Sequence, residues 1–313
     1  MPSGQVKLAP STADLPLREK VAGSIALFRD HWQAAREPSG FDWVFEDIDQ
    51  YDRLLRTHGA RPLPEARVFE IGYGARPYRF IAMSSMGIDV EGVDAEMPVL
   101  TGRPREFNAI FARNGLERVL KSLARHLLFD GHERRQFEEA LRVRGLRPTL
   151  DPSRLLVADA ASLDGIGPYD LIVSEDVFEH ISEDSLGALV PALARWLAPT
   201  GLALIRPNIY TGITGGHLVE WNRRSFSRRS RRRSEPWGHL RGRGYQANTY
   251  LNRLTRDDYR KLFEAHFEIL DEQVALPDLG RELLTESVRQ ELRSWDEEEL
   301  FSNQVRFVLR PKT

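Results

Sequence analysis

The 313-residue sequence contains no cysteine, and this absence removes several kinds of chemistry at once. Disulfide bonds, thiolate metal sites and cysteine nucleophiles are all excluded, so the fold must be stabilised by packing. Lysine is also scarce, because only five of the 44 basic residues are lysine and the other 39 are arginine. A single arginine therefore carries little functional information here.

Long apolar runs are missing as well. No window approaches the roughly 20 apolar residues that are needed to span a bilayer. The first twenty residues, MPSGQVKLAPSTADLPLREK, lack the basic start and apolar core of a secretory signal. A net charge of -2 gives no overall attraction to nucleic acid or to a membrane surface. We therefore expect a cytoplasmic protein without a transmembrane segment.

Short apolar runs alternate with helical patterns from residue 67 onward, which predicts an α/β fold with a mostly parallel sheet. Before them, residues 15–35 and 41–58 carry apolar side chains at helical spacing, so residues 1–60 are predicted to be helices that pack on the core. The predicted strands are ARVFEI, DVEGVD, RLLVAD, YDLIVS, GLALIRPN, FEILDEQVAL and NQVRFVLR.

About fifty residues, 100–150, separate the second and third apolar runs, far more than a strand-to-helix connection requires. The stretches FNAIFARNGLERVLKSLARHLLF and RRQFEEALRVRGL have helical spacing, so we expect an inserted helical lid within a domain spanning residues 61–313. Further on, TRDDYRKLFEAHF opens with a threonine cap, and GRELLTESVRQELRSW also predicts a helix.

The stretch RVFEIGYGAR ends an apolar run with an acid and two glycines, Gly72 and Gly74. Glycines at this place let the backbone approach a ligand closely, although a Gly-x-Gly alone is also typical of a tight turn. The nicotinamide fingerprint has a third glycine three residues after the second, where Pro77 stands, so a dinucleotide is disfavoured. Glu70 instead suits a cofactor with a positive amino group.

Two further acids end the next two runs. Asp94 lies twenty residues after Gly74 and is placed to accept hydrogen bonds from two ribose hydroxyls. Asp159 ends the LLVAD run and is suited to accept from an adenine amino group. Each acid alone would be an ordinary strand-end or capping residue, but their order along the chain favours a cofactor site.

These segments, in this order, resemble the class I S-adenosylmethionine-dependent methyltransferases. The acid-x-Gly-x-Gly pattern is matched by Glu70, Gly72 and Gly74, and YDLIVSEDVFEHI is similar to the strand-four segment, with Glu179 and His180 at the start of the next helix. The resemblance implies a Rossmann-like sheet with an antiparallel last strand, and S-adenosylmethionine as the cofactor. It implies cofactor contacts from Glu70, Gly72, Tyr73, Gly74, Asp94, Asp159, Ala160 and Glu175.

The sequence departs from the family at Arg76, where many members have a third glycine, and we expect this residue to begin a helix instead. The helical insertion also lies outside the resemblance. In the segment after strand four, SEDV replaces an Asn-Pro-Pro-Tyr type tetrapeptide, which argues against the amino-directed DNA and glutamine methyltransferases of the family.

Methyl transfer to an unactivated hydroxyl requires alignment of the acceptor and removal of a proton. Two candidate catalytic residues are predicted at the carboxyl edge of the sheet: His217, which we favour as the base, and His180. Glu220 is placed to orient His217. The alternatives are a surface-loop histidine at 217 and a packing role for His180. No metal site is predicted, although His217 and Glu220 have the spacing to supply two ligands.

Residues 222–244, NRRSFSRRSRRRSEPWGHLRGRG, hold nine arginines and one glutamate. In a substrate segment of about residues 209–250, they predict contact with an anionic acceptor such as a phosphorylated lipid carrier, nucleotide sugar or acidic glycan. A solvated basic loop is the simpler alternative. The predicted substrate-binding residues are Arg223, Arg224 and Glu220.

The sequence thus predicts O-methylation of a sugar, a glycan precursor or another small metabolite. One alternative is an RNA methyltransferase that uses the arginine cluster of residues 223–243, although the near-neutral overall charge makes nucleic acid a less favoured partner. Another is a non-catalytic module that binds S-adenosylmethionine. The sequence does not indicate an oligomeric state.

Overall fold

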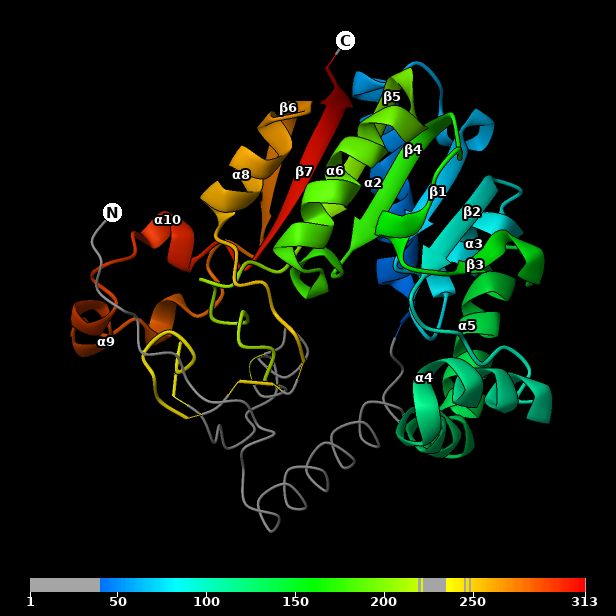
Figure 1. The fold of residues 1–313 in the computed structure, drawn as a ribbon, viewed down its shortest axis with the longest axis horizontal. Coiled ribbons are helices and arrows are strands. Elements are labelled where there is room, and N and C mark those ends of the chain that lie inside the picture. Colours follow the sequence, from blue (N-terminus) through cyan, green and yellow to red (C-terminus); the bar gives the residue numbers. More distant parts are fainter. Residues whose placement is uncertain (1–39, 219–220, 222–234, 245, 248, 313) are drawn as a thin grey trace.

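A seven-stranded sheet runs through the middle of the computed structural model, which describes residues 40–218, 221, 235–244, 246–247 and 249–312 (Figure 1). The strand order is β3-β2-β1-β4-β5-β7-β6, and β7 is antiparallel to both of its neighbours while the other pairs are parallel. This confirms the predicted Rossmann-like fold class and all seven strands. The strands are β1 Arg67–Ile71, β2 Asp89–Asp94, β3 Leu155–Val157, β4 Tyr169–Glu175, β5 Leu197–Arg206, β6 Phe267–Ala275 and β7 Gln304–Pro311.

The order of the strands reverses between β1 and β4, because the chain first adds strands on one side of β1 and then on the other. In open α/β sheets the crevice for ligands lies at such a point, beyond the carboxyl ends of the strands. The fold therefore indicates where a site should be sought before any side chain is considered.

Helices cover both faces of the sheet (Figure 1). One face packs against α2 and α3, and the other against α6 and α8, each through an apolar cluster. The predicted helix over residues 41–58 is confirmed by α2, whereas the predicted helix over 15–35 lies outside the described residues. No described helix is both long and apolar enough to span a membrane. The covering helices are α2 Asp42–His58, α3 Tyr78–Ser85, α6 Glu183–Trp196 and α8 Arg256–Glu264.

The long segment between β2 and β3 is helical, as predicted. It forms α4 (Pro104–Arg125), a π-helical turn (His126–Asp130) and α5 (Gly131–Val143). Within α4 the backbone leaves the helical conformation at Gly115, where φ is 78°. Figure 1 shows the insertion beyond the carboxyl ends of β2 and β3, on the edge where a ligand would bind. Its role as a lid stays a prediction.

Arg76 does not begin a helix, so this expectation was wrong. The helix α3 begins at Tyr78, after Pro77. The Arg76 side chain instead reaches the insertion, where its Nε donates to Asp130 Oδ1 at 2.8 Å and its Nη1 donates to Glu133. At the place of a third glycine, this chain thus has a side chain that ties the glycine turn to the inserted helices.

The predicted helix over residues 280–295 is broken into shorter pieces. Gly280 adopts a left-handed conformation with φ of 91°, and the Thr285 hydroxyl caps a new helix by accepting from Val288 N–H. By contrast, α8 begins as predicted, with Thr255 and Asp258 forming a capping box. The remaining helices are α9 Glu286–Glu291, α10 Glu297–Leu300 and the 3-10 turns η2 Leu63–Glu65, η4 Pro152–Arg154, η5 Ala160–Ser162, η6 Phe178–His180 and η8 Arg281–Leu283.

Candidate active site

The two glycines after β1 form a turn that contacts the end of β2. Gly72 and Gly74 both adopt left-handed conformations, with φ of 78° and 73°. The N–H of Gly74 donates to Asp94 Oδ2 at 2.8 Å, and Asp94 Oδ1 accepts from the N–H of Glu96 at 2.8 Å. Burial raises the pKa of Asp94, an effect that the bond from Gly74 opposes. The structure therefore brings three of the predicted cofactor residues together.

The two glycines differ in their surroundings, which gives a matched pair of substitutions. A Cβ at Gly72 would lie 2.1 Å from Val177 Cγ2, whereas a Cβ at Gly74 would have no neighbour within 4 Å. We expect Gly74→Ala to lower the free energy of unfolding by about 1–2 kcal/mol, the cost of a left-handed alanine. Gly72→Ala should cost about 2–4 kcal/mol, because overpacking adds to that strain.

Urea unfolding of both glycine variants measures this difference, and binding of S-adenosylhomocysteine by the folded Gly74→Ala protein adds a second observable. Since open space lies beside Gly74, its variant should fold and yet bind the cofactor product more weakly. Equal stability losses in the two variants would contradict the close contact of Gly72 with Val177.

The residues around this turn fit the cofactor that the resemblance implies. Glu70 is buried, and its Oε2 has no hydrogen-bond partner among the described residues, while its Oε1 lies 3.3 Å from Arg79 Nε. A buried carboxylate oxygen without a partner suits the amino group of S-adenosylmethionine. Each oxygen of Asp94 keeps a second lone pair for a ribose hydroxyl.

The positions of Tyr73, Asp159 and Ala160 give less direct support for a cofactor contact. The Tyr73 side chain is buried, and its hydroxyl donates to the carbonyl of Leu156 at 2.8 Å, so a cofactor contact would come from its backbone. Asp159 is exposed and accepts from Ala161 N–H at 3.0 Å, which places Ala160 at the start of the same short turn. The cofactor contacts of these residues stay predictions.

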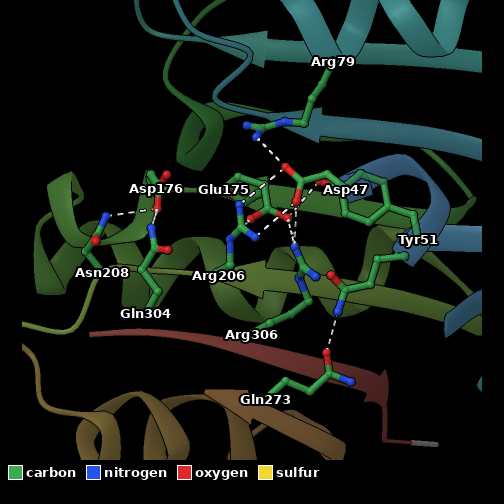
Figure 2. A network of polar contacts seen from close by, with 12 residues as sticks. Asp47, Tyr51, Arg79, Glu175, Asp176, Arg206, Asn208, Gln273, Gln304 and Arg306 are labelled. Atoms are coloured by element: carbon green, nitrogen blue, oxygen red, sulfur yellow. Dashed lines mark hydrogen bonds and ion pairs between the residues drawn. The ribbon is translucent and has the colours of Figure 1, made fainter. Parts of the chain in front are cut away.

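Glu175 belongs to a buried network of charges, which Figure 2 shows. Its Oε1 accepts from the Tyr51 hydroxyl at 2.8 Å and from Arg306 Nη2 at 2.9 Å, and its Oε2 pairs with Arg206. Burial raises the pKa of Glu175, and the arginines oppose that shift. The Glu175 carboxylate thus has three protein partners, and its contact with the cofactor stays a prediction.

Asp47 of α2 lies at the centre of the same network (Figure 2). Its carboxylate contacts Arg79 at 3.2 Å, Arg206 at 3.2 Å and Arg306 at 3.3 Å. With Glu70 and Glu175, three acids face three arginines, and the six residues come from six secondary-structure elements. This network was not predicted from the sequence, because its members are ordinary charged residues up to 259 positions apart.

A cavity of about 1220 Å³ lies next to the network, at the carboxyl ends of β4 and β5. Its lining includes Trp43, Arg79, Asp176, Asn208 and His217. The cavity exceeds the usual size of a small-molecule site and is open to solvent. It can therefore admit an acceptor next to the charge network.

Both predicted histidines approach one buried carboxylate, and one of them, His217, lines this cavity. Nε2 of His217 lies 3.8 Å from Glu179 Oε1, and Nε2 of His180 lies 4.0 Å from the same oxygen. The two rings are nearly perpendicular, with centroids 5.0 Å apart. Glu179 is 3% exposed and lies with His180 on the 3-10 turn η6, before α6 and not within it. We call these three residues the Glu-His-His group.

Burial sets the charge of this group. It raises the pKa of Glu179 to about 8, with the nearby Asp176 as the second cause. It lowers the pKa of His217 to about 4, with His180 and His239 adding to the effect. At neutral pH the His217 ring is therefore neutral, and Glu179 holds its proton when no cation is near.

The sequence analysis predicted no metal site, yet the Glu-His-His group is a cluster of metal-ligand residue types among the described residues. The adjacent Glu179 and His180 were visible in the sequence. That the loop after β5 folds back onto them was not, because nothing local fixes the position of His217.

The predicted substrate-binding residues Glu220, Arg223 and Arg224 lie outside the described residues, as does most of the arginine cluster. At its end, Arg241 and Arg243 pair with Glu291 at 2.7 and 2.9 Å. These two arginines therefore have a protein partner for their charge.

A family model and several solved structures match this chain. A family model described as a methyltransferase domain matches residues 43–270. A Clostridium acetobutylicum S-adenosylmethionine-dependent methyltransferase is 12% identical, with 93% of this chain and 98% of that chain covered and a TM-score of 0.45. Burkholderia thailandensis 1,6-didemethyltoxoflavin-N1-methyltransferase is 16% identical, with coverage of 98% and 95% and a TM-score of 0.41. No curated protein sequence matches the chain.

Proposed function

The chain belongs to the methyltransferase-domain family, as a class I S-adenosylmethionine-dependent methyltransferase, and from this premise we propose that it methylates a hydroxyl oxygen of a sugar, a glycan precursor or another small metabolite. The observation that carries the proposal is the position of His217 on the wall of the large cavity, with Glu179 and His180 next to it. A neutral amine needs no base to attack a methyl group, whereas a hydroxyl must lose its proton. A histidine at the acceptor wall, with a second one beside it, therefore supports oxygen as the target.

S-adenosylmethionine, when bound, supplies an electrophilic methyl group. The protein residues bind and orient it: Glu70 offers a buried carboxylate oxygen, and Asp94 offers oxygens for the ribose. On the acceptor side, His217 lines the cavity with a neutral ring, so the Glu-His-His group is suited to promote the loss of the hydroxyl proton. Alignment of acceptor and methyl group accounts for the rest of the catalysis.

The alternatives have less support. An RNA methyltransferase would use the arginine cluster, but Arg241 and Arg243 at its described end are paired with Glu291. A non-catalytic binding module would have no use for a cavity of about 1220 Å³ at the carboxyl ends of β4 and β5. An anionic acceptor remains our proposal for the segment of about residues 209–250.

The test is methyl transfer from labelled S-adenosylmethionine to matched acceptors: sugar phosphates, nucleotide sugars and acidic glycans, their amino-sugar analogues, and RNA. We expect label in an O-methyl product that mass spectrometry and NMR locate. His217→Ala should lower kcat by about 10²- to 10⁴-fold, the usual contribution of proton removal, while S-adenosylhomocysteine affinity is kept. Label only in amines or RNA would overturn the O-directed proposal.

A further inference from the structure

We propose that Glu179, His180 and His217 bind a divalent transition-metal cation at the edge of the acceptor cavity, which His217 lines. The cation would hold the acceptor oxygen and lower the pKa of its hydroxyl, so that the histidines serve as ligands and not as free bases. This role in activation rests on the proposed O-methylation, whereas binding of the cation itself does not.

The distances are close to those of a metal site. One ligand atom from each of the three residues lies within 4.8 Å of the other two, and Glu179 Oε1 is 3.8 and 4.0 Å from the two imidazole nitrogens. Ligands held at about 2.1 Å in tetrahedral geometry lie about 3.4 Å apart. The two distances from Glu179 Oε1 exceed this spacing by about half an ångström, and the distance between the two histidine ligand atoms exceeds it by at most about 1.4 Å, so small side-chain movements would bring these atoms around one ion.

The His180 ring is already oriented as a ligand. Its Nδ1 lies 2.9 Å from the carbonyl oxygen of Tyr250. A carbonyl oxygen only accepts, so Nδ1 must donate its proton and the Nε2 lone pair points toward Glu179. Such a bond from the second ring nitrogen to a backbone carbonyl is the usual way in which proteins fix a metal-binding histidine.

Glu179 supplies the second, independent observation. Its Oε1 accepts from Asn208 Nδ2 at 2.8 Å, but its Oε2 is buried and has no hydrogen-bond partner among the described residues. Buried carboxylate oxygens are almost always satisfied, so an unpartnered one requires an explanation. A cation shared with the two histidines would provide the missing interaction.

His217 is held in place by its loop. Its φ of 53° is in the left-handed region, which a non-glycine residue adopts at a cost. The conformation is fixed by the bond from its own N–H to the Thr214 carbonyl at 2.9 Å and by the bond from Ala247 N–H to the Gly216 carbonyl at 2.9 Å. The loop therefore presents this ring to Glu179 in a defined orientation.

Asp176 adds negative charge beside the site without filling it. Asn208 Nδ2 donates to Asp176 Oδ1 at 3.0 Å as well as to Glu179, and Gln304 Nε2 donates to the same Asp176 oxygen (Figure 2). Asn208 thus orients the Glu179 carboxylate without being a ligand itself. Since His217 and Asp176 both line the cavity, the remaining coordination positions would face the acceptor.

The ligand set selects the kind of ion. Two imidazoles and one carboxylate favour Mn²⁺, Co²⁺, Fe²⁺ or Zn²⁺ over Mg²⁺ and Ca²⁺, which prefer oxygen ligands. Three protein ligands with open positions are typical of catalytic and not structural metal sites. In the transfer, the O–CH₃ bond forms, the S–CH₃ bond breaks, and the hydroxyl proton passes to solvent. The oxidation state of the metal does not change, so no co-reactant is needed.

The test uses Mn²⁺ as the probe on the tag-free full chain, freed of metals by a chelator, with EPR and calorimetry as readouts. We expect one site in the wild type, and affinity at least about 100-fold weaker in His180→Ala, His217→Ala and Glu179→Gln. Asn208→Ala, which removes the amide bonds to Glu179 and Asp176 but none of the three ligands, should weaken binding about 10- to 100-fold. His266→Ala, which changes an exposed histidine between α8 and β6, should bind like the wild type.

S-adenosylhomocysteine binding by each variant controls for folding. No Mn²⁺ binding by the wild type, or equal binding by the wild type and the three ligand variants, would overturn the site. A chelator should abolish O-methyl transfer, and added Mn²⁺ should restore it. Transfer that persists in the presence of the chelator would overturn the role of the cation in activating the acceptor, while the proposed function would stand. Binding without any O-methyl transfer would sustain the metal site and refute the proposed function instead.

Discussion

Asp94→Asn is expected to weaken S-adenosylhomocysteine binding by about 10- to 150-fold. The substitution keeps the shape of the side chain but replaces one acceptor oxygen by a donor. Both oxygens already accept backbone N–H bonds from Gly74 and Glu96 at 2.8 Å, and the ribose hydroxyls need the remaining lone pairs. Hydrogen bonds to charged groups are worth about 1.5–3 kcal/mol each, which corresponds to the expected loss. Calorimetric titration of both proteins measures it.

The matched control for this titration is Asp89→Asn, at the opposite end of β2, where the exposed carboxylate pairs with Arg154. It should bind S-adenosylhomocysteine like the wild type. Equal affinities in wild type and Asp94→Asn would mean that Asp94 only closes the glycine turn, and the ribose contact would then have to come from another residue.

Much of the cofactor side could be predicted because its signals are local. An apolar run followed by Glu70, Gly72 and Gly74 predicts a strand and a turn, and carboxyl ends of parallel strands meet on one edge of the sheet. Asp94, at the end of the next strand, therefore had to lie near that turn. The bond from Gly74 to Asp94 is the direct consequence.

The acceptor side could be predicted only in part. His217 and His180 were identified as residues that follow two neighbouring strands, β4 and β5. The fold of loops without a regular pattern decides where three further groups lie: the Glu179 carboxylate between the histidines, Asn208, which donates to it, and the Tyr250 carbonyl. No periodicity encodes such contacts, so the Glu-His-His group becomes visible only in three dimensions.

Two errors have specific physical causes. Arg76 was expected to begin a helix because it stands where many family members have a third glycine. Its partners on the insertion, Asp130 and Glu133, are more than fifty residues away and give no sign in the sequence. The helix over 280–295 was predicted from apolar spacing, which does not register a left-handed backbone at Gly280 or a new cap at Thr285. In both cases a non-periodic feature decided the structure.

Asp47→Asn is expected to lower the free energy of unfolding by about 3–5 kcal/mol, the cost of breaking a buried ion pair by removing one partner. Asp47 is 7% exposed and contacts three arginines, two of which, Arg79 and Arg306, are themselves largely buried. Without its charge, three guanidinium groups face only Glu70 and Glu175. Urea unfolding measures the loss.

The control is Asp42→Asn. Asp42 lies on the same helix but is exposed and paired with Arg144, so its substitution should change the free energy of unfolding by at most about 1 kcal/mol.

A double-mutant cycle shows whether pairing is the cause of this loss. If the Asp47 carboxylate compensates the buried charge of Arg79, then Arg79→Gln should cost less in the Asp47→Asn background than in the wild type, because the guanidinium has by then lost one of its partners. The coupling should be about 0.5–3 kcal/mol, the range found for residues in one network. Strictly additive losses would mean that Asp47 stabilises the protein through the packing of α2 alone. The network would then be a consequence of how α2 docks on the sheet, and not what holds it there.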